Sequence, residues 1–348
     1  MKKIVVLIGL VFLISCQNDT DSAYEDINMP YDFEIPDNFP PLIYNLDRNP
    51  LTNYGVELGR KLFYEGRLSS TNIVSCAFCH EQAHAFTHHG HNLSHGVHDR
   101  VGRRNTPATQ NLGFYDTFFY DGAALNLDMV SIVPIHDENE MDETIPNILE
   151  KLRQDEEYQR LFKLAFDDEK ITSTNMFRAM SQFMVIMISK DSKYDKYVRN
   201  ERGGEMTAKE LYGLSLFQSK CASCHATDLF TDNEFRNIGL PINPILQDMG
   251  RAEVSGDPAD NNKFKVPSLR NVGLTAPYMH DGRFGSLNSV LNHYRTNVQD
   301  DANLDPFLRH ENGRGIPMTD EEAEAIIEFL HTLTDYEFIN NPELYFRT

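Results

Sequence analysis

Apolar residues recur at the three- and four-residue spacing of amphipathic helices along much of the chain. This spacing is regular in four segments, at residues 147–166, 175–188, 206–217 and 318–334. No run of alternating apolar and polar residues predicts a series of strands. We therefore expect a mainly α protein whose helices are joined by long irregular loops.

Two of these segments also show where the helix begins. Thr207 is followed three residues later by Glu210, and Thr319 is followed in the same way by Glu322. Each pair matches a capping box, in which the two side chains satisfy free backbone N–H groups of the first turn. A similar pattern predicts a helix that begins after Thr52.

The two halves of the chain repeat each other. Residues 106–122 align without gaps on residues 266–282. The identical positions are Pro107/Pro267, Asn111/Asn271, Gly113/Gly273, Asp121/Asp281 and Gly122/Gly282. A G-x-x-L-F pattern also occurs in each half, at Gly59/Leu62/Phe63 and Gly213/Leu216/Phe217. The repeat indicates a tandem duplication of a small domain, with the two copies at residues 41–200 and 201–348.

The N-terminus has the features of an export signal. Residues 1–16 combine two lysines, an apolar run and a small-residue junction that ends in Cys16, as in a signal peptide. The run Leu13–Cys16 matches a lipobox, in which the cysteine is lipidated, although an ordinary signal peptide with a chance cysteine is the alternative. Residues 17–40 are acidic and contain prolines, which predicts an extended tether. We expect a bacterial lipoprotein that faces the periplasm or the cell surface and contacts the membrane only through that lipid.

The charge of the chain narrows the range of partners. It has 32 lysines and arginines against 52 acidic residues, which gives a formal net charge of −20. Such a surface repels nucleic acid and anionic lipid and favours a partner with a basic face. The alternative is that the charge mainly keeps the protein soluble. A homodimer is compatible with these features but is not indicated by them.

The four cysteines other than Cys16 lie in two short motifs. CAFCH occupies residues 76–80 and CASCH occupies residues 221–225. In the C-x-x-C-H pattern, two thiols bond to the vinyl groups of a haem and the histidine ligates its iron. The same residue types also suit a zinc site, but the wide separation of the motifs argues against it. We predict two covalent haem c groups, attached through Cys76, Cys79 and His80 and through Cys221, Cys224 and His225.

Further motifs in the same order resemble those of the bacterial di-haem cytochrome c peroxidase family, which includes the methylamine-utilisation enzyme MauG. They are RNTP at 104–107, YDG at 120–122, NEM at 139–141, FTDNEFRNIGLP at 230–241, LRNVGLTAPYMHDG at 269–282 and FLHTLTD at 329–335. The resemblance implies that the N-terminal haem reacts with peroxide and that the C-terminal haem receives electrons. It also implies a calcium ion between the domains, held by Asn105, Thr275 and Pro277.

The resemblance gives two further residues a part in catalysis. Glu140 matches a glutamate that moves a proton above the peroxide-binding iron, although its acidic neighbours are also typical of a solvated surface. Tyr120 stands where the family usually has a tryptophan between the haems, so an aromatic electron relay is retained. Val130 aligns with a glutamine near the peroxide site of relatives, which is a departure from the usual pocket.

The second iron is expected to have an unusual ligand. His280 matches a family histidine that lies near the second haem and does not normally ligate it. The usual distal ligand is a methionine fourteen residues later, but that position here is Tyr294, and MauG also has a tyrosine there. We expect Tyr294 to ligate the second iron opposite His225, with His293 or Met279 as the alternatives.

The first iron needs a vacant position in order to bind peroxide. Some members of the family block this position with a second histidine, and the aligned site falls between His95 and His98. Five histidines lie in the twelve residues 84–95, a composition that favours an exposed loop over a ligand. We therefore expect an open first haem.

Three functions remain in view. The leading hypothesis is a di-haem peroxidase that reduces hydrogen peroxide to water with electrons from a small redox protein, such as a cytochrome c or a cupredoxin. The second is a MauG-like oxidase that acts on a protein residue or a small molecule, as the tyrosine at position 294 suggests. The third is a two-haem electron carrier without enzymatic activity.

Overall fold

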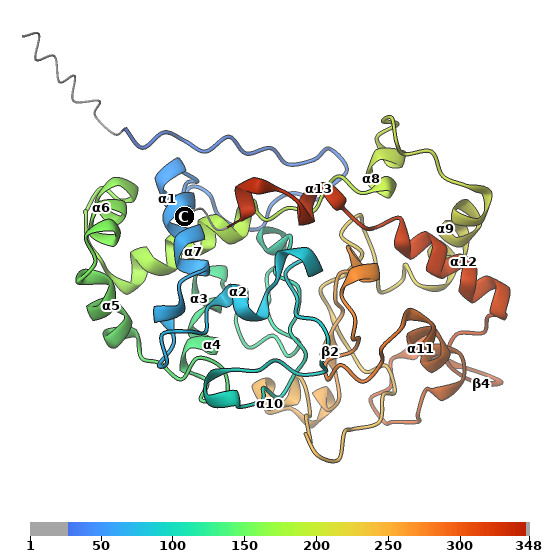
Figure 1. Ribbon diagram of the computed structural model, residues 1–348. Coiled ribbons are helices and arrows are strands. Elements are labelled where there is room, and N and C mark those ends of the chain that lie inside the picture. Colours follow the sequence, from blue (N-terminus) through green and yellow to red (C-terminus); the bar gives the residue numbers. More distant parts are fainter. Residues whose placement is uncertain (1–26, 346–348) are drawn as a thin grey trace, which may run out of the picture.

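The computed structural model describes residues 27–345, which form helices joined by long loops (Figure 1). The predicted signal peptide, Cys16 and residues 17–26 of the predicted tether lie outside the described residues. Among the described residues, no helix combines the length and the apolar character needed to cross a membrane.

The fold is mainly α, as the sequence predicts. The helices are α1 (Asn53–Phe63), α2 (Cys76–Cys79), α3 (Leu127–Val130), α4 (Ile132–His136), α5 (Ile145–Arg153), α6 (Glu156–Ala165), α7 (Ser173–Ile186), α8 (Lys193–Val198), α9 (Ala208–Lys220), α10 (Ala252–Ser255), α11 (Leu287–Asn292), α12 (Asp320–His331) and α13 (Tyr336–Ile339). The strands of the described chain are β1 (Phe235–Arg236), β2 (Phe264–Lys265), β3 (Arg309–His310) and β4 (Gly313–Arg314). They form two antiparallel pairs, β1 with β2 and β3 with β4.

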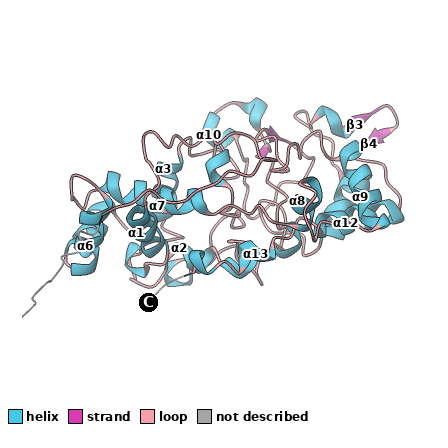
Figure 2. Cartoon of the chain, turned by 90° about the horizontal axis from the view of Figure 1, so that it is seen from above, coloured by secondary structure: helices cyan, strands magenta, loops and turns pink. Residues whose placement is uncertain are grey.

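One pair of packed helices supports each half. In the first half α1 packs on α7, and in the second half α9 packs on α12. The two pairs lie toward opposite ends of the molecule, with the loops between them (Figure 2). The ring centroids of Phe63 and Phe183 are 5.4 Å apart in the first pair, and those of Phe217 and Phe329 are 5.0 Å apart in the second. The two halves therefore share a core arrangement as well as sequence motifs.

A glycine permits the close approach within each helix pair. A Cβ atom added to Gly59 would lie 1.9 Å from the carbonyl oxygen of Ala179, and one added to Gly213 would lie 1.9 Å from that of Ala325. Helix packing at this density leaves no space for a side chain. The repeated G-x-x-L-F pattern is thus explained by the contact between the helices.

The predicted helix starts are confirmed. The side chain of Thr52 accepts a hydrogen bond from the backbone of the first turn of α1. Thr207 and Thr319 begin α9 and α12, each with the complete capping box that the sequence predicts. These caps satisfy backbone donors that have no partner inside the helix.

The regular apolar spacing of residues 147–166 extends over two helices, α5 and α6, rather than one. Asp155 lies between them, and its carboxylate accepts hydrogen bonds from the backbone N–H groups of Glu157 and Tyr158. A carboxylate in this position is a favourable N-cap, so it begins a new helix although the apolar spacing continues.

The duplicated segments follow the same backbone path. Asn111 and Asn271 both adopt left-handed conformations, with φ of 58° and 59°. The side-chain oxygen of Asn111 accepts a hydrogen bond from the backbone of Ser189, and that of Asn271 accepts one from Asp335. The aligned asparagines therefore perform the same local task in each half.

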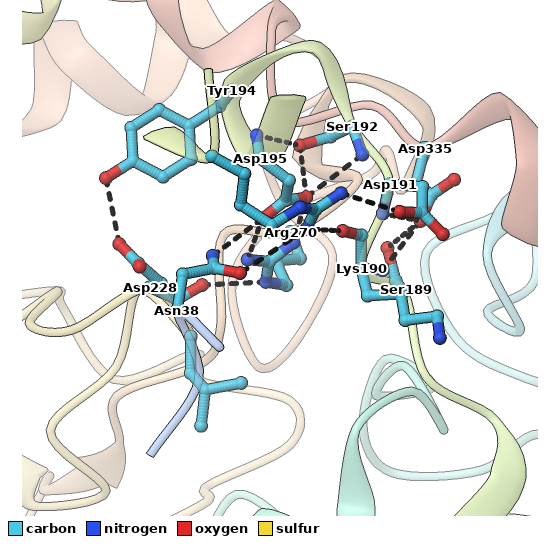
Figure 3. Close-up of polar contacts among 12 residues, drawn as sticks. Asn38, Ser189, Lys190, Asp191, Ser192, Tyr194, Asp195, Asp228, Arg270 and Asp335 are labelled. Carbon is cyan, nitrogen blue, oxygen red and sulfur yellow. Dashed lines mark hydrogen bonds and ion pairs between the residues drawn. The ribbon is translucent and has the colours of Figure 1, made fainter. Parts of the chain in front are cut away.

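A buried ion pair joins the end of the first half to the second half (Figure 3). Arg270 donates to both carboxylate oxygens of Asp195 in α8, at 2.8 and 2.7 Å, and both side chains are fully buried. Ser192, the N-cap of α8, donates to the same carboxylate. Nearby, Asp335 accepts a hydrogen bond from the backbone of Lys190. The buried ion pair therefore holds α8 against the second half.

The described part of the predicted tether, residues 27–40, runs extended along the body of the protein (Figure 1). Phe39 is buried, and its ring centroid lies 5.4 Å from that of Phe114. The guanidinium of Arg270 lies 4.4 Å from the centroid of the same ring. The end of this segment is thus held by contacts with both halves.

Candidate active site

A cavity of about 1020 Å³ is lined by residues of both halves. This volume is at the upper end of the range of about 300–1000 Å³ that is common for ligand pockets. Both C-x-x-C-H motifs contribute to its wall, through Cys76, Cys79, His80, Cys221, Cys224 and His225. The fold thus brings the two predicted haem attachment sites, far apart in sequence, to one internal space.

The two histidines of these motifs are held in the same way. Nδ1 of His80 is hydrogen-bonded to the carbonyl oxygen of Phe86 at 2.8 Å, and Nδ1 of His225 to that of Phe230 at 3.0 Å. This bond leaves Nε2 of each ring available to a metal and fixes the tautomer. Burial lowers the pKa of His80 to about 4 and also lowers the pKa of His225, so both rings are neutral, as a ligand must be.

The cysteines fit covalent attachment of haem and do not fit the zinc alternative. All four described cysteines are free thiols. A zinc site needs several histidine, cysteine or acidic side chains close together. Among the described residues there is one such cluster, and it contains no cysteine. Each motif therefore offers two thiols and one neutral imidazole to the cavity, which is the donor set for one haem c.

Glu140 lies on the wall of the cavity, in the loop after α4. Its backbone carbonyl accepts a hydrogen bond from Val97 at 2.8 Å, and its own N–H donates to the carbonyl of Asp137 at 3.1 Å. Burial raises the pKa of the Glu140 carboxyl to about 7, and the negative charge of Asp137 adds to this shift. A carboxyl with this pKa can both accept and donate a proton near neutral pH.

Tyr120 and His280, the aromatic residues before the two Asp-Gly turns, also line the cavity. The His280 ring stacks on Phe264 with a centroid distance of 3.7 Å. Burial lowers the pKa of His280 to about 4, although Asp281 and Asp248 act in the opposite direction. Burial also raises the pKa of Tyr120 above its usual value. Both rings are therefore neutral groups on the wall of the cavity that the two attachment motifs also line.

The three candidate ligands of the second iron are placed differently. Tyr294 and Met279 both line the cavity, whereas His293 does not. The Nε2 atom of His293 is hydrogen-bonded to the carbonyl of Ile238 at 3.0 Å, which leaves it poorly placed as a ligand. Burial raises the pKa of the Tyr294 phenol, so only a bound cation would stabilise its anion.

Of the two histidines predicted to flank a blocking position on the first iron, His95 lines the cavity and His98 does not. Both side chains belong to exposed residues. The histidine loop of residues 84–95 is therefore exposed only in part: His89, His91 and His95 are exposed, whereas His84 is half-buried and His88 is buried against the Thr106 hydroxyl. His95 lies where the loop meets the cavity.

The predicted calcium ligands Asn105, Thr275 and Pro277 all line the cavity. The amide nitrogen of Asn105 donates to the carbonyl of Asn92 at 2.9 Å, and the Thr275 hydroxyl lies 3.5 Å from the carbonyl of Val272. The calcium site stays a prediction.

Lys265 is a cavity residue that the sequence did not point to. Its ammonium donates to the carbonyl of Thr117 at 2.5 Å and lies 4.4 Å from the centroid of the Tyr115 ring. Burial lowers its pKa to about 8, although the negative charge of Asp116 acts in the opposite direction. The duplication could have identified it, because Lys265 aligns with Asn105.

A duplicated helical fold with two C-x-x-C-H motifs on one cavity defines a di-haem c-type cytochrome. Residues 53–203 match the model of the di-haem cytochrome c peroxidase family, and residues 211–334 match that of cytochrome c. The chain is 32% identical to a methylamine utilization protein MauG of Methylorubrum extorquens, over 82% of this chain and 79% of that protein. It is 30% identical to a cytochrome c551 peroxidase of Nitrosomonas europaea, over 80% and 79%.

A solved structure of a MauG-like protein associated with microbial copper homeostasis has the same fold. Its TM-score is 0.81, with 30% identity over 90% of this chain and 99% of that one. The chain therefore belongs to the di-haem cytochrome c peroxidase family and carries two covalently bound haem c groups.

Proposed function

We propose that the protein reduces hydrogen peroxide to water at the haem attached through Cys76, Cys79 and His80. Electrons from a small redox protein would enter at the haem attached through His225. Membership of the family supports a peroxide-dependent oxidoreductase. The observation that carries the assignment to the first haem is Glu140, a carboxyl with a pKa near 7 whose negative charge acts on the thiols of Cys76 and Cys79.

The haem supplies an iron that binds peroxide and conducts the electrons. The protein supplies the movement of the proton. In its deprotonated form, Glu140 accepts a proton from the peroxide oxygen nearer the iron and returns it to the outer oxygen, which leaves as water. Cleavage of the O–O bond consumes two electrons, and two further protons complete the two water molecules. Tyr120, on the wall of the cavity that both attachment motifs line, is the proposed relay for the electrons.

The electron donor is proposed to carry a basic face, because the chain has a formal net charge of −20. Attraction between opposite charges raises the rate of encounter and weakens with salt. We further propose a periplasmic location with a lipid on Cys16 and a calcium ion held by Asn105, Thr275 and Pro277. Each of these proposals extends the family assignment and can be tested separately.

The test is peroxide consumption by the purified di-haem protein with a reduced donor. We expect turnover with a reduced basic cytochrome c or cupredoxin, and a lower second-order rate constant as salt is raised. An acidic cytochrome of similar potential is the matched control for charge. If both haems are intact and peroxide is not consumed with any donor, the proposed peroxidase function is wrong.

Tyr294 favours a second candidate, a MauG-like oxidase. A phenolate ligand stabilises ferric and higher oxidation states, whereas a thioether favours the ferrous state. Relatives named MauG are among those that match this chain. In such an oxidase, the oxidising equivalents from peroxide would be drawn from a protein residue or a small molecule instead of from a redox protein. Mass spectrometry of an oxidised co-substrate, in the absence of an electron donor, distinguishes this candidate from the first.

A further inference from the structure

A small cluster of metal-binding side chains lies outside the haem cavity. It consists of Glu81, His84 and His89, each of which offers one ligand atom within 4.8 Å of the other two. Nδ1 of His89 is 3.1 Å from Oε1 of Glu81, and the His84 and His89 rings stack with centroids 4.0 Å apart. None of the three residues lines the cavity, so neither haem accounts for their convergence.

The backbone holds two of these side chains on a rigid turn. The N–H of Glu81 donates to the carbonyl of Thr87, and the N–H of Phe86 donates to that of Glu81, both at 2.9 Å. Ala85 and Phe86 both have positive φ values, 52° and 60°, and both are completely buried. The chain thus folds back sharply between His84 and His89, and the buried Phe86 anchors that fold in the core.

The cluster is accessible to an ion from solvent. The side chains of His89 and Glu81 are 53% and 37% exposed. Among the described residues, the Glu81 carboxylate forms no ion pair with a lysine or an arginine, and its Oε1 lies beside the His89 ring. An exposed carboxylate beside two imidazoles can therefore take up a cation without first giving up a basic partner.

We infer that Glu81, His84 and His89 form a binding site for one borderline divalent transition-metal ion of the zinc type. Two imidazoles and one carboxylate are a known donor set for Zn²⁺, with a water in the fourth position. Two donors of a tetrahedral zinc ion lie about 3.3 Å apart, given metal–ligand distances of about 2.0–2.1 Å. The separation of 3.1 Å between His89 and Glu81 is already close to this distance. The His84 ring, now stacked on that of His89, has to turn toward the ion.

The site would act on the turn that orients the first haem ligand. The carbonyl of Phe86, inside this turn, is hydrogen-bonded to Nδ1 of His80 at 2.8 Å, and Glu81 directly follows His80. A bound ion would link the two ends of the turn and resist its opening. The site does not depend on peroxide turnover, so its test is separate from that of the proposed function.

Equilibrium dialysis against Zn²⁺ tests the inference. The di-haem protein is purified without a polyhistidine tag, and the buffer contains excess Ca²⁺. We expect one zinc ion for every two haem irons. His84→Ala and His89→Ala should each weaken binding by about tenfold or more, because each removes a ligand. His91→Ala is the matched control, since His91 is an exposed histidine of the same loop outside the cluster, and it should bind zinc as the wild type does.

Haem absorbance shows whether each variant is folded. His89 is exposed, so His89→Ala should fold, and it remains a valid test if His84→Ala does not fold. Zinc should also slow hydrogen exchange at the Phe86 N–H in the wild type and not in His89→Ala. The inference is overturned if the wild type binds no stoichiometric zinc, if His89→Ala binds it unchanged, or if His91→Ala loses it equally.

Discussion

The backbone N–H of Asn105 donates a hydrogen bond to the carbonyl of His280 at 2.7 Å and so joins the first half to the second. The same bond recurs in the opposite direction, where the N–H of Lys265 donates to the carbonyl of Tyr120 at 2.7 Å. The duplication aligns Asn105 with Lys265 and Tyr120 with His280. Each half therefore holds the aromatic residue of the other half on the wall of the shared cavity.

This arrangement makes Tyr120→Phe an informative change. The variant keeps the ring and the carbonyl that Lys265 binds, and removes only the phenol that can be oxidised. We expect electron transfer between the haems to slow by about tenfold, equivalent to about 1.4 kcal/mol in the barrier, with normal haem content. Stopped-flow reduction of the first haem by a donor that reduces the second measures this rate. Tyr115→Phe, another buried phenol on the cavity wall, should leave the rate unchanged, and an equal loss in both variants would refute the relay.

Glu140→Gln removes the proposed proton carrier while keeping its size. General acid–base catalysis contributes about 100- to 10,000-fold, so kcat/KM for peroxide should fall within that range. Binding of cyanide to the first haem should be retained. Glu138→Gln is the control, because Glu138 is a neighbouring acid that does not line the cavity. Full activity in Glu140→Gln would remove this residue from the mechanism.

The pKa of Glu140, raised by burial to about 7, predicts a pH dependence. The active form is the carboxylate, which predominates above the pKa, so kcat/KM should rise with pH and level off above about pH 7. Asp137→Asn removes a negative charge that raises this pKa and should move the rise to lower pH. The check is to measure kcat/KM against pH for the wild type and for this variant. Identical profiles would show that Glu140 does not determine the rise of kcat/KM with pH.

The sequence predicts the helix starts and the duplication because their signals are local. Thr207 caps the first turn of its own helix, so its signal is contained in a few consecutive residues. Gly213 is visible in the sequence as part of the repeat, but its reason, the contact with Ala325 of α12, depends on how the two helices pack. The crossed bonds of Asn105 and Lys265 could not be predicted, since they depend on how the halves dock. The histidine loop was expected only to be exposed. Its turn at Ala85 and Phe86 has no sequence signal, because these residue types rarely adopt positive φ.

Gly59→Ala and Gly213→Ala test the packing of the helix pairs. Alanine favours a helix over glycine by about 1 kcal/mol, but the added Cβ would lie 1.9 Å from a carbonyl oxygen of the facing helix. We expect overpacking to dominate, with a net loss of about 1–3 kcal/mol in the free energy of unfolding. Thermal unfolding monitored by circular dichroism measures the loss. Gly285→Ala, with open space around its Cβ position, should have little effect, and stabilised variants at 59 and 213 would contradict the packing.

Arg270→Met leaves the buried carboxylate of Asp195 without its partner. Breaking a buried pair in this way costs about 3–5 kcal/mol, which should lower Tm markedly at pH 7. Arg309→Met breaks an exposed pair with Asp300 and should cost at most about 1 kcal/mol. Equal effects of the two changes would show that the buried pair does not hold α8 against the second half.

The same pair predicts the behaviour in acid. Burial alone would raise the pKa of Asp195, but the hydrogen bonds and charge of Arg270 bring it below its usual value. A depressed pKa contributes stability above the unfolded-state pKa of about 4, and this stability is lost as pH falls toward the folded-state value. In Arg270→Met, burial without a partner raises this pKa, so the buried carboxyl takes up a proton at higher pH than in the wild type. The difference in Tm between the wild type and Arg270→Met should therefore shrink as pH falls from 7, and continue to shrink below about pH 4. A difference that is constant from pH 7 to pH 3 would mean that Asp195 is not the titrating partner.

Tyr294→Met decides between the two candidate functions. If Tyr294 ligates the second iron, replacing a phenolate by a thioether favours the ferrous state and raises the reduction potential of that haem. A spectroelectrochemical titration should show this rise for one haem only. Met279→Leu is the control, because Met279 lines the same cavity and is not the expected ligand.

A donor-dependent peroxidase should keep or gain activity with the methionine, since its second haem accepts electrons more readily. A MauG-like oxidase should lose activity, because it needs the tyrosine to stabilise the oxidised iron, and an unchanged potential would show that Tyr294 is not a ligand.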